Sequence, residues 1–104
     1  MEKVNEKQCK EIISTCTCPV IVDFSASWCM PCKALKSTLD ELSANYVAHA
    51  KFINCDAEEC TGLTEEYGIM NVPTVLFFKD GNLVDRFTGA LPKSKIIEKI
   101  EVIL

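Results

Sequence analysis

The residues best suited to chemistry in this chain are two cysteines, Cys29 and Cys32, with only two residues between them. They follow the apolar run 19–24 and precede a stretch of helical periodicity, which predicts that Cys29 lies where a helix begins. Unpaired backbone N–H groups and the positive end of the helix dipole favour a thiolate at that place. We therefore expect Cys29 to be a nucleophile within a pair that switches between dithiol and disulfide.

A zinc site is the alternative use of such a pair. Structural zinc takes four ligands, and the sequence contains neither a second Cys-x-x-Cys nor a pair of histidines, since it has a single His. The pattern thus favours redox chemistry, and we expect no metal.

Several further motifs resemble the thioredoxin family. They are spread over almost the whole chain: Val22-Asp23-Phe24, Trp28 to Lys33, Val72-Pro73-Thr74, Phe77 to Gly81, and Gly89-Ala90. The resemblance implies the thioredoxin fold, an α/β fold in which helices flank both faces of a central mixed β-sheet. It also implies a protein-disulfide reductase that works through Cys29 and Cys32 and regains electrons from thioredoxin reductase or an equivalent donor.

The residue periodicity predicts alternating elements within one domain, 1–104. Apolar residues recur at helical spacing or form short runs that are typical of buried strands. Lys79-Asp80-Gly81-Asn82 predicts the tight turn of a hairpin. The expected elements are helix 5–16, strand 20–24, helix 32–48, strand 51–55, a short helix containing Leu63 and Tyr67, a hairpin over 74–87, and a last helix with Ile96 to Leu104 on one face.

Asp23 is the next candidate for chemistry. A carboxylate within a strand that is buried on both faces is costly when ionised, so burial should raise its pKa. The alternative is a solvated Asp that only marks the end of the strand. The resemblance favours a buried Asp behind the second cysteine, where it accepts the proton of Cys32.

A target-docking surface around the cysteines is implied by the resemblance. Pro73 by itself reads as an ordinary proline at the start of a strand. The resemblance instead implies a cis peptide bond before Pro73, with the backbone of Val72 free to pair with an extended target segment. The surface that it implies consists of Trp28, Met30, Pro31, Val72, Pro73, Gly89 and Ala90.

The chain departs from the family pattern at three places. Met30 stands where the family usually has Gly, which bears on the choice of partner. Ser37 lies where many members have a proline that kinks the long helix. A strand lysine that pairs with the buried Asp in some members has no clean counterpart, because Lys51 is offset and Phe52 lies nearer that place.

Five further cysteines are less clearly assigned. Cys9 and Cys16 fall on the apolar face of the first helix and are interpreted as small hydrophobic residues. Cys16 and Cys18 flank Thr17 at the end of this helix and would be open to oxidation or modification. A second, regulatory disulfide between Cys55 and Cys60 is a hypothesis that the sequence leaves open.

Composition limits the function classes. A chain of 104 residues with a formal net charge of −4 and no cluster of basic residues argues against nucleic acid and anionic membranes as partners. Residues 1–7 contain no apolar leader, and the seven cysteines are an odd number, so we expect a monomer in the reducing cytoplasm. No Gly-x-Gly-x-x-Gly sequence is present, and no cofactor is implied.

Two other functions compete with disulfide reduction. An oxidase or isomerase of the same fold is less favoured, because Pro31 stands where such enzymes commonly carry His. A docking module without catalysis would need neither cysteine.

Overall fold

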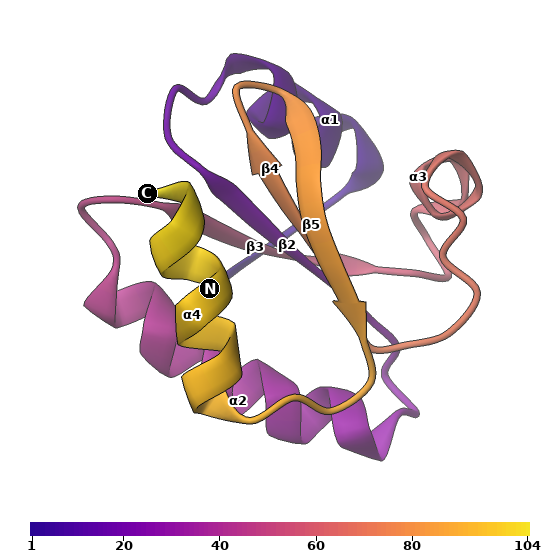
Figure 1. Cartoon of the computed structure of the whole chain (residues 1–104). Coiled ribbons are helices and arrows are strands. Elements are labelled where there is room, and N and C mark those ends of the chain that lie inside the picture. The colour runs from indigo at the N-terminus through magenta and orange to yellow at the C-terminus, as the bar shows by residue number, and fades with distance from the viewer.

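Helices cover both faces of a central five-stranded sheet in the computed structural model, which describes residues 1–104 (Figure 1). The strand order is β1-β3-β2-β4-β5. Strands β1, β3 and β2 are parallel to one another, β4 is antiparallel to β2, and β5 is antiparallel to β4. This mixed sheet confirms the predicted fold class. The elements are β1 (Glu2–Val4), α1 (Glu6–Thr15), β2 (Val20–Ser25), α2 (Met30–Asn45), β3 (Lys51–Asp56), α3 (Thr61–Glu66), β4 (Thr74–Lys79), β5 (Asn82–Thr88) and α4 (Lys93–Ile103).

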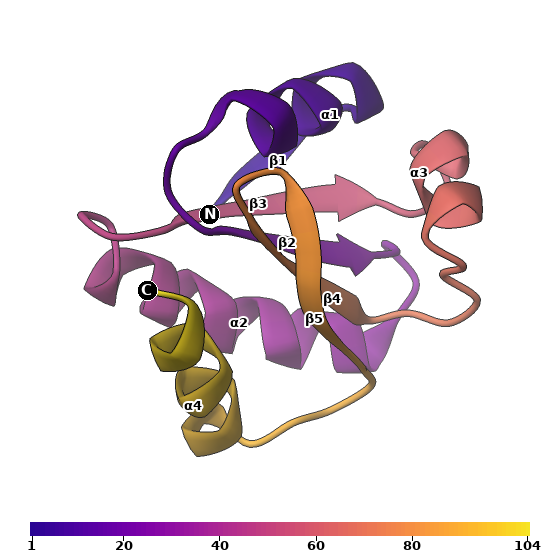
Figure 2. The ribbon, with the colours of Figure 1, turned by 45° about the horizontal axis from the view of Figure 1, so that its top comes forward.

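The sheet separates two apolar cores. Figure 2 shows α1 and α3 on one face and α2 and α4 on the other. Because side chains alternate along a strand, Val22 and Phe24 enter the core under α1 and α3, whereas Ile21 enters the core under α2 and α4. Burial on both faces explains why β2 reads as a continuous apolar run.

Two elements differ from the prediction. The long helix α2 begins at Met30 instead of residue 32 and ends at Asn45, with Tyr46 as its C-cap. It runs without interruption through Ser37. Strand β1 was not predicted, because its three residues are too few to show alternation, yet it pairs in parallel with β3.

The hairpin of β4 and β5 forms as predicted. Asp80 and Gly81 both have positive φ, at 52° and 79°, which is the conformation that a two-residue type I′ turn requires. No helix of the protein has the length and apolar character needed to cross a bilayer.

Candidate active site

The two cysteines lie where α2 begins. Cys29 is the N-cap residue, and its Sγ accepts the backbone N–H of Cys32 at 3.3 Å. Pro31 lies in the first turn, where a missing N–H costs no helical hydrogen bond. Cys29 and Cys32 form a disulfide in this structure, with their Cα atoms 5.3 Å apart. The helix start thus provides the N–H groups that the sequence predicted around Cys29.

Burial alone hardly distinguishes the two cysteines, since 4% of Cys29 and 2% of Cys32 is exposed. Their surroundings differ more. Sγ of Cys29 lies 3.8 Å from the carbonyl oxygen of Val72. Cys32 instead lines a pocket of about 180 Å³, which Ser25 and Asn54 also line. Each cysteine therefore faces a different part of the molecule.

The loop before β4 lies against the disulfide. Its Val72–Pro73 peptide bond is cis, as the resemblance implied, and Val72 packs against the small cluster that contains both cysteines. The carbonyl oxygen of Pro73 accepts the backbone N–H of Gly89 at 2.8 Å, which brings the Gly89-Ala90 segment to the same place. Pro73 itself is buried, so it contributes backbone rather than side-chain surface.

Two large apolar side chains beside the cysteines are open to solvent. Trp28 is 68% exposed and Met30 is 71% exposed. The indole Nε1–H of Trp28 donates a hydrogen bond to Oε1 of Glu58 at 2.9 Å, which fixes the orientation of the ring. A groove beside Trp28 is lined by Ala26, Ala57, Glu58, Thr64, Ile69, Met70, Asn71 and Val72.

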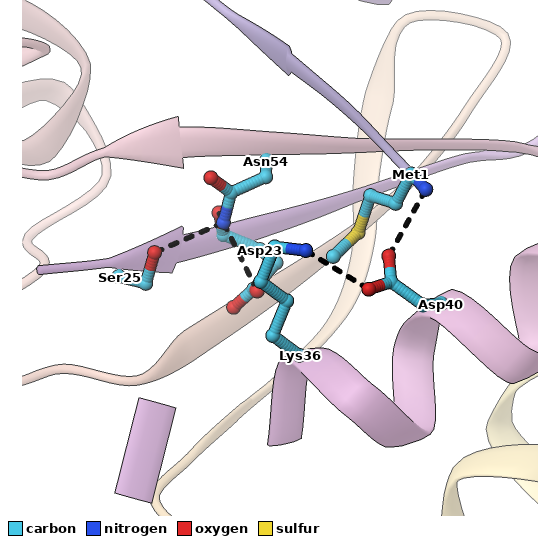
Figure 3. A network of polar contacts seen from close by, with 6 residues as sticks. All are labelled: Met1, Asp23, Ser25, Lys36, Asp40 and Asn54. Carbon is cyan, nitrogen blue, oxygen red and sulfur yellow. Dashed lines mark hydrogen bonds and ion pairs between the residues drawn. The ribbon is translucent and has the colours of Figure 1, made fainter. Parts of the chain in front are cut away.

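Asp23 lies on the face of the sheet that α2 covers. It follows Ile21 by two residues, and strand alternation therefore points both side chains to that face. Asn54 is its register partner on β3, and Nδ2 of Asn54 donates to Oδ2 of Asp23 at 3.1 Å (Figure 3). The same nitrogen lies 2.9 Å from Oγ of Ser25.

Burial gives Asp23 an unusual proton affinity. Removal from water raises its pKa to about 6, against the hydrogen bond from Asn54 and the charge of Lys36, which both lower it. The other carboxylate oxygen, Oδ1, is buried and has no hydrogen-bond partner. Asp23 is thus fully buried and shifted as predicted, and it is not a solvated residue at the end of a strand.

Asp23 connects to the second cysteine through its neighbours. Asn54, which holds Asp23, lines the same pocket as Cys32, together with Lys36 from α2. Asp23 itself does not line this pocket. Asn54 therefore links the predicted carboxyl group to the pocket that the predicted resolving thiol lines.

Four residues of this region were not predicted: Lys36, Asp40, Asn54 and Glu58. The Lys36–Asp40 spacing of four residues is a recognisable ion-pair signal on a helix. Asn54 and Glu58 become relevant only through strand register and loop packing, which no local pattern reveals.

The five other cysteines are free thiols, and the disulfide between Cys55 and Cys60 that the sequence left open as a hypothesis is not formed in this structure. Cys9, Cys55 and Cys60 are buried in the core under α1 and α3, as predicted for Cys9, and Cys16 packs partly buried against it. Contact with Cys9 and burial raise the pKa of Cys55. The chain has no cluster of three His, Cys, Asp or Glu side chains able to hold a metal ion.

Comparisons with known proteins point to one family. The family model for thioredoxin matches residues 1–102. The chain is 43% identical over 83 residues to thioredoxin C-2 of Corynebacterium nephridii, covering 80% of this chain and 77% of that protein. The structure of chloroplastic thioredoxin z is similar, with a TM-score of 0.89, 27% identity, and coverage of 99% of this chain and 93% of that one.

A longer relative shows the limits of the match. The chain is 38% identical over 101 residues to the chloroplastic M-type thioredoxin of Spinacia oleracea. The match covers 97% of this chain, which spans only 56% of the spinach protein. The family model and these similarities, together with the Cys29–Cys32 pair at the start of α2, show that the chain belongs to the thioredoxin family.

Proposed function

We propose that the protein is a thiol–disulfide oxidoreductase that reduces disulfides in other proteins. The observation that carries this proposal is the position of Sγ of Cys29, which accepts a backbone N–H at the start of α2. In the reduced protein, a thiolate at this position gains the same hydrogen bond and the favourable field of the helix. Cys29 is therefore the attacking group.

The exchange proceeds in two displacements. The Cys29 thiolate attacks one sulfur of the target disulfide, and the other target sulfur leaves as a thiolate that takes a proton from water. Cys32 then passes its thiol proton to the carboxylate of Asp23 and attacks Sγ of Cys29. The second target thiolate leaves, so the target gains two electrons and Cys29–Cys32 becomes a disulfide.

Asp23 suits the role of proton acceptor because its pKa of about 6 lies near neutral pH. At pH 7 it is mainly a carboxylate and still holds a proton more strongly than an exposed Asp does. The pocket that Cys32 shares with Asn54 supports a short route for the proton.

Targets dock, in this proposal, on the surface formed by Trp28, Met30, Pro31, Val72, Pro73, Gly89 and Ala90. The exposure of Trp28 and Met30 supports this role, since adjacent exposed apolar side chains beside the cysteines offer a contact area to a protein target. The backbone of Val72 supplies hydrogen-bonding groups for an extended target segment. Met30 adds a flexible side chain that adapts to different targets.

Electrons return from a separate donor, thioredoxin reductase or an equivalent protein, and no resident cofactor is required. We place the protein in the cytoplasm, because its five free thiols suit a reducing compartment. We also propose that it acts as a monomer. Fractionation of the source cells tests the location, and recovery in a plastid fraction would contradict it. Light scattering on the purified protein tests the monomer.

Reduction of a protein disulfide tests the activity. Wild-type protein with dithiothreitol should reduce insulin much faster than dithiothreitol alone, and Cys29→Ser should remove the gain. Cys16→Ser, which changes a free cysteine, is the control. Equal rates for wild type and Cys29→Ser would refute the proposal and favour a docking module.

Trapping of the intermediate tests the order of the two cysteines. Cys32→Ser should accumulate a mixed disulfide between Cys29 and the target, because the second displacement is blocked. The adduct should disappear in Cys29→Ser/Cys32→Ser. Trapping by Cys29→Ser alone would reverse the assignment.

A further inference from the structure

Three side chains of α2 form one row beside the buried carboxyl group. Cys32, Lys36 and Asp40 follow each other at intervals of four residues and therefore lie on one side of the helix. In the view of Figure 3, Lys36 extends from α2 toward the sheet, and its ammonium group is bonded to Asp40. The Lys36 Nζ to Asp40 Oδ2 distance is 2.9 Å.

Strand β3, which pairs with β2, directs no cation to Asp23. Lys51 of β3 is directed to Glu2, with Nζ and Oε1 3.4 Å apart, and Phe52 is buried in the core under α2 and α4. The two charged side chains that act on Asp23 both come from α2. The Lys36 ammonium lowers the pKa of Asp23, and the Asp40 carboxylate raises it.

We propose that Lys36 and Asp40 are positioning residues that together set how firmly Asp23 holds its proton. Lys36 has two carboxylates within its range, one buried and one at the surface. When Asp40 binds Lys36, the ammonium group is drawn away from Asp23. When Asp40 is neutral or absent, Lys36 is free to turn toward Asp23 and to favour its charged form.

The surface pair contributes little to stability. The side chains of Lys36 and Asp40 are 48% and 37% exposed, and exposed ion pairs add at most about 1 kcal/mol to folding. Their effect on a carboxylate buried next to them is larger, because the dry region under α2 screens charges less than water does. That this proton affinity matters for catalysis rests on the proposed role of Asp23 as the acceptor of the Cys32 proton.

Other charged groups surround the same region. Lys3 of β1, Lys33 of α2 and Asp56 of β3 line the pocket of Cys32. The Met1 ammonium group lies 3.0 Å from Oδ1 of Asp40, while Lys36 binds the other oxygen of that carboxylate. A variant that tests the proposal must therefore be judged by the titration of Asp23 itself, not by an overall pH optimum.

Two substitutions on one helix should move that titration in opposite directions. Carboxyl ¹³C shifts of Asp23 are followed against pH in the disulfide form. Lys36→Met should raise the midpoint by roughly 0.5 pH unit, since it removes the nearby cation. Asp40→Asn should lower the midpoint by a similar amount, since it removes a like charge and releases Lys36.

The control is Lys95→Met, which removes the same charge from an exposed ion pair with Glu98 on α4, and its Asp23 midpoint should equal that of the wild type. Unchanged midpoints in both Lys36→Met and Asp40→Asn, or shifts of the same sign, would overturn the proposal. A purely structural ion pair would instead lower the unfolding free energy in both variants and leave the Asp23 midpoint unshifted, with the larger loss in Asp40→Asn, which also removes the contact with the Met1 ammonium group.

A rate measurement separates this inference from the proposed function. Resolution of a preformed mixed disulfide on Cys29 is timed against pH for the wild type and Asp23→Asn. If the two pH profiles coincide, Asp23 is not the proton acceptor and that part of the proposed function fails. The titrations of Lys36→Met and Asp40→Asn decide the charge pair independently of that result.

Discussion

Asn54 holds Asp23 from the neighbouring strand, because the parallel register of β2 and β3 sets the two residues opposite each other. Nδ2 of Asn54 donates to Oδ2 of Asp23 at 3.1 Å and lies 3.2 Å from the Asp23 carbonyl oxygen. A neutral donor offsets only part of the cost of burying a carboxylate. Burial of Asp23 therefore costs folding free energy, and the size of this cost depends on pH.

Asp23→Asn should stabilise the protein at neutral pH. The pKa of Asp23 is about 6 when folded, against about 3.9 for an unfolded Asp. The folded wild type thus binds the extra proton, and its free energy of unfolding falls as pH rises from about 4 to about 6. Urea unfolding at pH 7 should show a gain of at most about 3 kcal/mol for the variant.

The gain from Asp23→Asn should shrink toward zero below about pH 4, where the carboxyl group is protonated in both states. Asp80→Asn, which neutralises an exposed carboxylate in the hairpin, is the control. A difference between Asp23→Asn and wild type that stays constant from pH 3.5 to 8 would rule out this explanation.

Asn54→Val should raise the pKa of Asp23 above its value of about 6, because the hydrogen bond that favours the charged form is lost. The free energy of unfolding at pH 7 should fall by about 1–3 kcal/mol. Carboxyl NMR titration and urea unfolding measure the two effects. Ser25→Ala is the matched control, since it removes another partner of Asn54 and leaves the Asp23 contact in place.

Glu58→Ala should weaken the reduction of protein disulfides. Loss of the hydrogen bond to Nε1 frees the exposed Trp28 ring, so kcat/KM should fall by about two- to tenfold for a protein target. A small aromatic disulfide, which needs little docking surface, should react at the wild-type rate. Glu59→Ala is the control, and an equal loss there would contradict a specific role for Glu58.

Alkylation of the reduced native protein should separate the cysteines into two groups. Iodoacetamide should modify Cys29 first, because its position at the start of α2 favours the thiolate. The buried thiols of Cys9, Cys55 and Cys60 should react at least about 100-fold more slowly until denaturant is added. Peptide mass spectrometry reads out each position. Rapid labelling of Cys55 in the folded protein would contradict the packing of this core.

Most of the fold follows from local patterns in the sequence. One element each is predicted by three local patterns: strand β2 by its apolar run, the hairpin by Asp80-Gly81, and α2 by its stripe of leucines. Strand β1 escaped prediction because its pairing with β3, and not its composition, makes it a strand. The apolar pattern predicts the start of α2 two residues too late, because Met30 and Pro31 precede the first buried position of the helix.

The candidate site likewise contains residues that local sequence patterns reveal and residues that only the tertiary structure reveals. Cys29 and Cys32 are recognisable from their spacing, and Asp23 from a charge within an apolar run. Asn54 is not recognisable, since its role depends on which residue of β3 lies opposite Asp23. Glu58 likewise acquires a function only when its loop approaches Trp28.

Lys36 borders the pocket of Cys32, whereas Trp28 borders the groove of Val72, and the two hollows share only Ala26. Selection for a new client and selection for a different working acidity can therefore act on separate side chains. An engineer can likewise alter Lys36 or Asp40 without redrawing the contact area that recognises clients. Client recognition and working acidity can thus change independently within one very small domain.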